Sequence, residues 1–289
     1  MNSSLPTQIV ATFSIAATDG IDWGVAVASK FLAVGAVVPA AASGVGAIAT
    51  QAMGNTSFKA DGLRMLREGV SASAVVDRLT GDDPDRDHRQ LGVVDSFGRA
   101  ASYTGAACFA WAGSRMGPNY TCQGNILTGP GVVEAMAAAF EGSTGRLADR
   151  LLTSLKAGDD DGGDSRGRQS AALLVVRSGG GYGGFDDRMI DLRVDDLPRP
   201  IPELERLLRL WRLHFEVPTK EGLIPVDAGI VALLRSGLEL RGQLDGAASD
   251  EQVIDALQRW AGMENLEERC KNRTLVDPLV LALLAGDAG

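Results

Sequence analysis

Thr12 is the residue whose type and position suggest the most specific chemistry in this chain. A threonine hydroxyl is a poor nucleophile, but an N-terminal threonine carries an α-amine that can accept the hydroxyl proton. Such an amine titrates at pH ~7.7 to 8.0, so it is a usable base near neutrality. Eleven residues precede Thr12, so this chemistry depends on whether they are removed.

Other polar residues could complete such a site. Lys30, at the end of a β-rich run, could lower the pKa of the nucleophile or hold a substrate carboxylate, or it could be a solvated strand-end lysine. Asn125 could donate its side-chain amide to an oxyanion, or it could cap a turn. A late loop could supply a charge network or be merely flexible; its charged residues are Asp164, Arg166 and Arg168.

The elements that would position these residues follow from hydrophobic periodicity and turn signals. Residues 8–16 and 22–30 predict two strands joined at Asp19-Gly20, a strong hairpin signal. Ser71 is predicted to cap the second of two helices that follow. Further strands are expected at 45–51, 90–95, 100–104, 120–126, 170–177 and 189–194, with helical patterns from Pro130 to Leu155 and at 202–215 and an acidic loop at 158–168.

This order of elements predicts an α+β fold, because strands and helices do not alternate strictly enough for a doubly wound parallel sheet. Two sheets packed face to face, with helices outside each, suit it best. From residue 218 the pattern becomes mainly helical, with a Ser249/Gln252 capping box and a helix start at Asp277-Pro278. We therefore expect an extension or propeptide at 1–11, a main domain at 12–217 and a small helical domain at 218–289.

Composition excludes several function classes. The net charge of −9 with no basic stripe argues against a nucleic-acid partner. Three cysteines without paired spacing and two distant histidines predict no disulfide framework, no metal site and no cofactor, in a reduced, cytoplasmic setting. Residues 31–52 lack charge, but their glycines and Pro39 favour a turn and a buried strand over a membrane helix. We also expect a homo-oligomer and no membrane partner.

Several motifs occur in the order found in a known family. They are Thr12-Phe13-Ser14-Ile15, Gly24 to Gly35, Ala49-Thr50-Gln51-Ala52, Gln123 to Leu127 and Gly163 to Ala171. With these motifs, residues 12–215 resemble the bacterial domain-of-unknown-function family one thousand and twenty-eight, placed in the Ntn-hydrolase superfamily. The resemblance implies a four-layer αββα sandwich in which an N-terminal Thr, Ser or Cys attacks an amide carbonyl.

The resemblance also frames the open questions at Thr12. Family members usually begin Met-Thr-Phe-Ser, whereas residues 1–11 intervene here. This extension could mean autocleavage between Ala11 and Thr12, a start codon assigned too early, or a protein that is not an N-terminal-nucleophile enzyme.

The run Gly24 to Lys30 is similar to the second strand of proteasome β-type subunits, where an Asp and a basic residue flank a Ser. Ser29 and Lys30 match this pattern, but Ala28 stands at the Asp position. By analogy, Asp164 could supply the missing charge. Catalytic roles are thus assigned to Thr12, Lys30, Asn125 and Asp164, and substrate binding to Ser29, Thr50, Gln51, Arg166 and Arg168.

The C-terminal segment resembles a domain family named for peptidoglycan binding, on Asp250-Glu251, Leu257, Trp260, residues 264–269 and Asp277-Pro278. A dimerisation or lid module fits the same acidic helical surface. The leading hypothesis is an amidohydrolase acting on a small amide or peptide-like substrate through an acyl-Thr12 intermediate. The alternatives are a non-catalytic scaffold or ligand-binding protein, and a binder of cell-wall fragments.

Overall fold

The structure is a computed structural model that describes residues 12–286. The expected strand residues 8–11 lie outside this range. The chain falls into two compact units that meet between Glu205 and Arg206. This division lies inside helix α6 (Pro200–Phe215), earlier than the expected boundary after residue 217, because Leu213 of α6 is buried in the core of the second unit.

The first unit contains a six-stranded sheet in which all neighbouring strands are antiparallel. Its central pair is a hairpin of β1 and β2, which the sequence predicts from Asp19-Gly20. Gly20 has a left-handed φ of 88°, and the carboxylate of Asp19 accepts hydrogen bonds from two amides of the turn. The strands in sheet order are β10 (Arg188–Val194), β9 (Ser170–Val176), β2 (Trp23–Ser29), β1 (Thr12–Thr18), β8 (Tyr120–Gly124) and β7 (Gly113–Gly117).

A second sheet of four strands packs face to face against the first. Its strands in order are β3 (Pro39–Ala42), β4 (Gly46–Ala52), β5 (Arg89–Asp95) and β6 (Ala100–Thr104). Strand β4 crosses β1 and β2, and β5 crosses β8. Small and β-branched side chains fill much of the space between the sheets, including Ala16, Val25, Val27, Ala47, Ala49 and Val94. Such small side chains let the two sheets approach closely.

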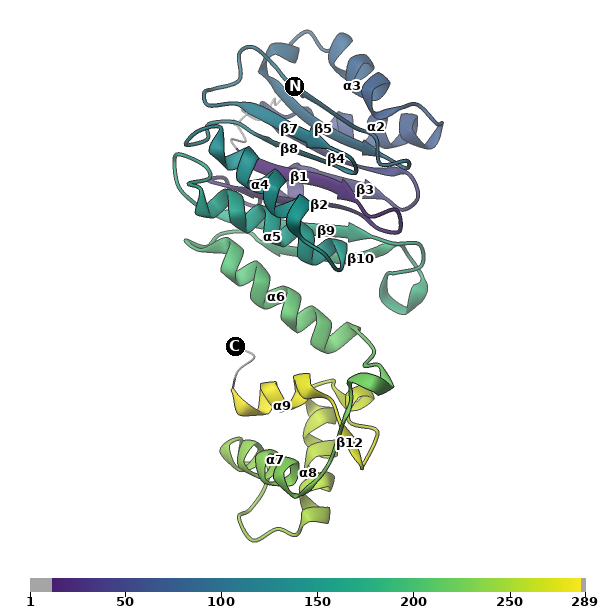
Figure 1. Cartoon of the computed structure of the whole chain (residues 1–289), viewed down its shortest axis with the longest axis vertical. Helices are drawn as coiled ribbons and strands as arrows, with labels where there is room; N and C mark the ends of the chain where they lie inside the picture. The colour runs from purple at the N-terminus through teal and green to yellow at the C-terminus, as the bar shows by residue number, and fades with distance from the viewer. Residues whose placement is uncertain (1–11, 287–289) are drawn as a thin grey trace, which may run out of the picture. The chain divides into compact units, whose positions relative to one another are not determined.

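Helices cover the outer faces of both sheets (Figure 1). Helices α2 (Ser57–Arg67) and α3 (Ala72–Gly81) pack on the four-stranded sheet, and α4 (Gly131–Gly142) and α5 (Leu147–Asp160) pack on the six-stranded sheet. Ser71 caps α3 as expected, accepting a hydrogen bond from the amide of Ala74. The unit is therefore an α+β structure built on antiparallel sheets.

The uncharged segment 31–52 forms several short elements. It contains the one-turn helix α1 (Val34–Val37), β3 and β4, so the expected turn and buried strand are present, together with a helical turn and a strand that the sequence reading missed. Among the described helices, none combines the length and the apolar character that crossing a membrane requires.

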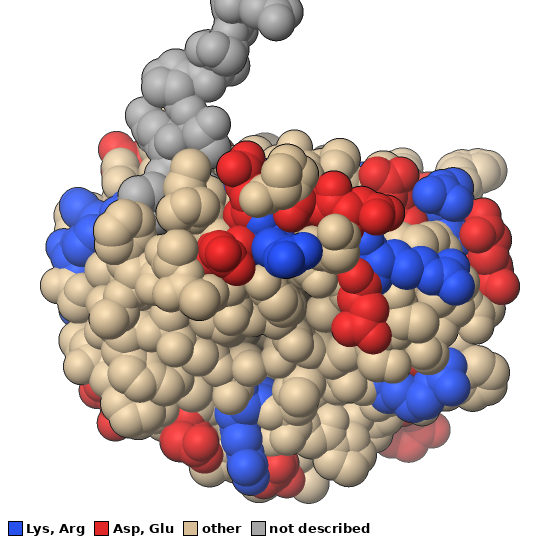
Figure 2. Space-filling model, turned by 90° about the horizontal axis from the view of Figure 1, so that it is seen from above, with Lys and Arg blue, Asp and Glu red and all other residues tan. Residues whose placement is uncertain are grey.

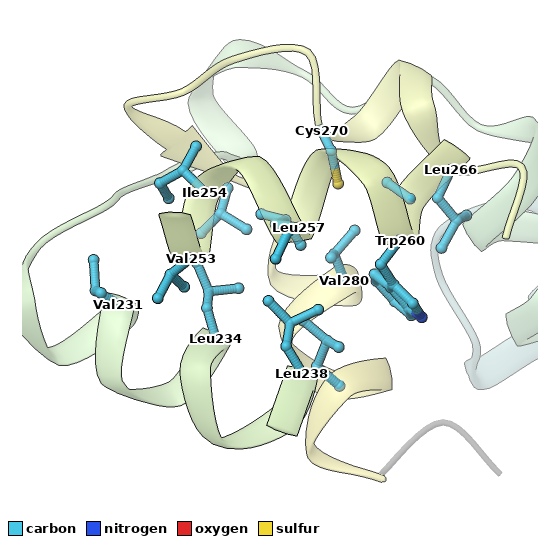
Figure 3. Packing of buried hydrophobic residues seen from close by; sticks show 14 of the residues in the cluster. Val231, Leu234, Leu238, Val253, Ile254, Leu257, Trp260, Leu266, Cys270 and Val280 are labelled. Carbon is cyan, nitrogen blue, oxygen red and sulfur yellow. The ribbon is translucent and has the colours of Figure 1, made fainter. Parts of the chain in front are cut away.

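The second unit is mainly helical and has its own apolar core (Figure 3). Ser249 and Gln252 form the expected capping box at the start of α8 (Asp250–Met263), and Asp277 caps α9 (Pro278–Ala285) ahead of Pro278. Figure 3 shows Leu234 and Leu238 of α7 packed toward Leu257 and Trp260 of α8. The elements of this unit are β11 (Ile224–Pro225), α7 (Ala228–Leu240), α8 (Asp250–Met263), β12 (Leu275–Val276) and α9 (Pro278–Ala285). In both units, short 3₁₀ helices are also present, at Arg86–His88, Tyr182–Gly184, Lys220–Gly222 and Glu267–Arg269.

One face of the molecule shows how its surface charges are distributed. On the face drawn in Figure 2, acidic and basic side chains stand beside one another, with uncharged surface between them. That face offers no continuous basic track along which a nucleic-acid backbone could lie.

The three cysteines provide a first test of the packing. Burial raises the pKa of all three thiols, that of Cys270 to about 11. Cys122 and Cys270 are buried, whereas Cys108 is half-buried. Because alkylation requires an accessible thiolate, iodoacetamide at pH 8 should modify Cys108 first in the folded protein and all three thiols in denaturant. Peptide mass spectrometry checks this order, and equal rates at Cys108 and Cys122 would contradict the packing.

Candidate active site

Thr12 stands at the start of the central strand of the six-stranded sheet, between two polar neighbours. It pairs with Ser29 of β2, and its hydroxyl donates to the Ser29 hydroxyl at 3.3 Å. On the other side, Thr12 and Asn125 exchange backbone hydrogen bonds of 3.4 and 3.0 Å. Cross-strand partners point to the same face of a sheet. The three side chains therefore form a row directed toward the four-stranded sheet.

A pair of glutamines from the opposite sheet faces this row. Gln51 of β4 pairs with Gln90 of β5, and both are fully buried. The Gln51 amide nitrogen donates to the backbone oxygens of Thr12 and Gln123, each at 3.3 Å, and to Oε1 of Gln90 at 2.8 Å. We call this group the polar layer; its members are Thr12, Ser14, Ser29, Gln51, Gln90, Gln123 and Asn125.

Ser14 and Gln123 form a second row of the polar layer, and their packing requires a glycine at position 92 of β5. Ser14 donates to Oε1 of Gln51 at 2.7 Å and accepts from the amide of Gln123 at 2.6 Å. A Cβ at Gly92 would lie 2.1 Å from Oε1 of Gln123. Only glycine lets the amide of Gln123 fit between the sheets at this point.

The hydrogen-bond pattern fixes the orientation of the Asn125 amide. Gln90 Nε2 donates to the backbone oxygens of Gly124 and Gly113, at 2.7 and 3.2 Å, so its Oε1 must be the accepting atom. That oxygen receives Nδ2 of Asn125 at 2.9 Å. Within the described part of the chain, Oδ1 of Asn125 consequently has no hydrogen-bond partner, although the residue is 1% exposed. An unsatisfied buried acceptor costs about 1–3 kcal/mol, so this atom requires an explanation.

Two residues of the polar layer are followed by a strained backbone. Ala52, after Gln51, has a φ of 65°, and Ile126, after Asn125, has a φ of 53°. The left-handed region is unfavourable for side chains with a Cβ, most of all for a β-branched one. Such strain, about 1–3 kcal/mol per residue, concentrates at functional sites.

Thr50 and Lys30, also selected from the sequence, lie outside the polar layer. Side chains alternate along a strand, so Thr50 faces away from the layer that Gln51 joins. Its hydroxyl donates to the backbone oxygen of Asn55 at 3.2 Å. By the same alternation, Ser29 rather than Lys30 shares the face of Thr12. Lys30 is exposed, and its Nζ donates to the backbone oxygen of Arg168 at 3.4 Å.

The remaining candidates, together with Asp159, form a second group at the end of β2. We call it the charged cluster; its members are Lys30, Asp159, Asp164, Arg166 and Arg168. Asp164 is 4% exposed and accepts the backbone amides of Lys30 and Arg166 as well as the Arg166 guanidinium, at 2.8–3.0 Å. Arg168 pairs with Asp159 at 2.6 Å. Three cations and two carboxylates thus lie next to the polar layer, joined to it through Ser29 and Lys30.

The structure therefore brings Thr12, Ser29, Gln51 and Asn125 together, and gathers Lys30, Asp164, Arg166 and Arg168 separately. Gln90 and Gln123 were missed as site residues. Both lie in strands whose residues are all buried, and a glutamine beside apolar strand residues is the signal that could have revealed them. Within residues 12–286, no cluster of three or more His, Cys, Asp or Glu side chains could hold a metal ion.

Comparison with known proteins assigns this chain to a family. The model described as "Family of unknown function (DUF1028)" matches residues 12–204, and one described as "Putative peptidoglycan binding domain" matches residues 230–284. A similar solved structure is that of a Silicibacter pomeroyi protein assigned to DUF1028. It is 32% identical, with a TM-score of 0.63, over 70% of this chain and 89% of that one. Among proteins of curated function, none is significantly similar. The chain belongs to the DUF1028 family.

Proposed function

We propose that the protein is an N-terminal-nucleophile amidohydrolase of the Ntn type. It would cleave its own Ala11–Thr12 bond and then hydrolyse a small amide or peptide-like C–N bond through an acyl-Thr12 intermediate. The observation that carries the proposal is the burial of Thr12 in a polar layer, at the start of the central strand, where an apolar core would be more stable. The succession of helices, two facing sheets and helices supports a four-layer Ntn sandwich.

Self-cleavage would begin with attack of Thr12 Oγ1 on the carbonyl carbon of Ala11. The Ala11–Thr12 C–N bond breaks, the Thr12 nitrogen takes a proton, and water hydrolyses the resulting ester. This sequence frees both the hydroxyl and the α-amine of Thr12.

Turnover would use the freed amine as the base. It takes the hydroxyl proton while Oγ1 attacks the substrate carbonyl; the substrate C–N bond breaks, and the leaving amine receives that proton. The amine then activates the water that hydrolyses the ester. In this proposal the side-chain amide of Asn125 and the hydroxyl of Ser29 bind the reacting groups at Thr12, its hydroxyl and its amine. The amide of Gln51 holds the backbone carbonyl of Thr12.

The charged cluster supports a substrate with an acidic group near the scissile amide. Arg166 and Arg168 have half-exposed side chains, and Lys30 is exposed. The guanidinium groups could bind a carboxylate, although both already pair with carboxylates of the protein. Thr50, whose hydroxyl donates to the backbone oxygen of Asn55, is given no role in this proposal. We further propose a cytoplasmic homo-oligomer, in line with the free cysteines.

A β-lactone probe tests the proposal without knowledge of the substrate. Thr12 Oγ1 attacks the lactone carbonyl, the ring C–O bond opens, and the whole mass of the probe is added. We expect labelling on the peptide that begins at Thr12 and none in Thr12→Ala, whereas Thr18→Ala, a buried threonine on the same strand, labels normally. Labelling of Thr12→Ala at the wild-type rate would contradict the proposal.

A second candidate function, binding of cell-wall fragments, is favoured by a cavity in the C-terminal unit. The matched domain model is named for peptidoglycan binding. A cavity of about 610 Å³ lies within this unit, where Asp245, Gln252, Asp255 and Arg259 line it. These side chains offer both signs of charge to a fragment that carries sugars and a short peptide.

Titration of the full chain with muramyl dipeptide tests this binding. We expect Arg259→Ala to weaken it about tenfold, the usual loss for one charged hydrogen bond. Arg209→Ala, an exposed arginine of the same unit, should leave it unchanged. Calorimetry provides the affinities, and no binding by the wild-type chain at millimolar ligand would exclude this function.

A further inference from the structure

One buried polar atom in the polar layer has no partner, and it lies beside the residue on which the proposed function depends. Oδ1 of Asn125 makes no hydrogen bond with any described residue, although Asn125 is only 1% exposed. The amide cannot simply turn over, because its Oδ1 would then face Oε1 of Gln90, another acceptor, at the place where Nδ2 now donates at 2.9 Å. The orientation of Gln90 is in turn fixed by its own two bonds to backbone oxygens. The layer therefore presents an acceptor to which no residue between 12 and 286 donates.

Cleavage of the Ala11–Thr12 bond would supply that donor. A backbone amide nitrogen carries one hydrogen, and at Thr12 that hydrogen is directed to the backbone oxygen of Asn125, at 3.4 Å. An α-ammonium carries three. Two additional hydrogens would thus appear inside a buried layer, next to the residue that holds the free acceptor. Buried donors without acceptors are costly, so the two groups complement each other.

We propose that Oδ1 of Asn125 accepts a hydrogen bond from the α-amine of the cleaved Thr12, and that Gln90 is the positioning residue that turns Oδ1 toward it. This inference rests on the proposed function, since it needs a free amine at Thr12. It differs from an oxyanion role for Asn125, which would use Nδ2. The bond holds the amine beside Oγ1 and favours its protonated form, so Asn125 sets the pH at which the amine becomes a base.

Titration of the Thr12 amine tests the proposal directly. The chain beginning at Thr12 is obtained by self-cleavage, or by expressing Met directly before Thr12 so that methionine removal exposes it. The amine is labelled with acetic anhydride across pH, and the N-terminal peptide is quantified by mass spectrometry. Asn125→Ala should lower the pKa of the amine and raise its labelling near neutral pH about tenfold. Asn125→Asp, of the same shape but charged, should raise the pKa.

Two further variants separate a positioning role of Gln90 from a general disturbance of the polar layer. Gln90→Met removes the group that orients the Asn125 amide and should also lower the pKa of the Thr12 amine. Thr121→Ala, at a β8 residue whose hydroxyl donates to Oε1 of Gln123 at 2.9 Å, should leave the titration unchanged. An unchanged titration in Gln90→Met would remove Gln90 from the proposal.

The possible outcomes test this hydrogen bond separately from the proposed self-cleavage on which it rests. If the Thr12 amine titrates identically in wild type, Asn125→Ala and Asn125→Asp, the inference is overturned even where the chain cleaves itself. If the wild-type chain keeps residues 1–11 but the amine exposed by methionine removal responds to Asn125 as described, self-cleavage is wrong and the hydrogen bond stands.

Discussion

A chain carrying Thr12→Ala is expected to keep residues 1–11 entirely, while the wild-type chain loses them. Alanine has no hydroxyl to attack the Ala11 carbonyl, so the N-to-O shift cannot begin. Removing a nucleophile lowers the rate of such a reaction by at least about 10³-fold. Intact-mass measurement after days of incubation detects the retained segment.

Two substitutions serve as controls for this result. Thr12→Ser keeps a hydroxyl and should still cleave, at a reduced rate. Thr18→Ala removes a buried threonine from the far end of β1, where its hydroxyl donates to the backbone oxygen of Asp22, and should cleave normally. Cleavage of Thr12→Ala between residues 11 and 12 would show that a protease, and not the chain itself, removes the extension.

Asp277→Ala is expected to destabilise the C-terminal unit by about 3–5 kcal/mol. Asp277 is 3% exposed and forms an ion pair with Arg269, itself 6% exposed. The Arg269 guanidinium also donates to backbone oxygens near the end of α6, including those of Arg212 and Leu213. Removing the carboxylate leaves a buried, unpaired charge, and it also removes the N-cap of α9.

Asp227→Ala provides a matched control in the same unit. Asp227 caps α7 by accepting the amide of Ile230 at 2.9 Å, but it has no ion pair among the described residues. Its loss should cost only about 1 kcal/mol. Hydrogen exchange of peptides from α7 to α9 measures both changes, and equal losses of protection would mean that the buried ion pair adds nothing beyond a cap.

Elements with strong local signals were predicted closely from the sequence. The β1–β2 hairpin, the Ser71 cap and the Ser249/Gln252 capping box depend on residues close together in the chain. By contrast, β7 (Gly113–Gly117) was missed, because Gly113-Ser114-Arg115-Met116-Gly117 has few strand-forming residues and is paired by its neighbour β8. Helix α1 has a single turn, too short for periodicity to reveal.

The candidate site was predictable only in part, for a reason of geometry. Thr12, Ser29, Gln51 and Asn125 were selected from motifs, but their meeting depends on which strands pair and which faces oppose. Gln90 shares that face because β4 and β5 pair in register, a contact between residues 39 positions apart. Ser29 and Lys30 were both selected by sequence similarity, and strand alternation places Ser29, the cross-strand partner of Thr12, on the face of Thr12.

The mass of the purified wild-type chain tests the central claim most directly. Both the proposed chemistry and the unpartnered oxygen of Asn125 point to a free amine at Thr12. We predict a mature chain whose mass and N-terminal peptide correspond to a start at Thr12. A chain that still begins at Met1 or Asn2 after prolonged incubation would contradict self-cleavage and favour a non-catalytic scaffold.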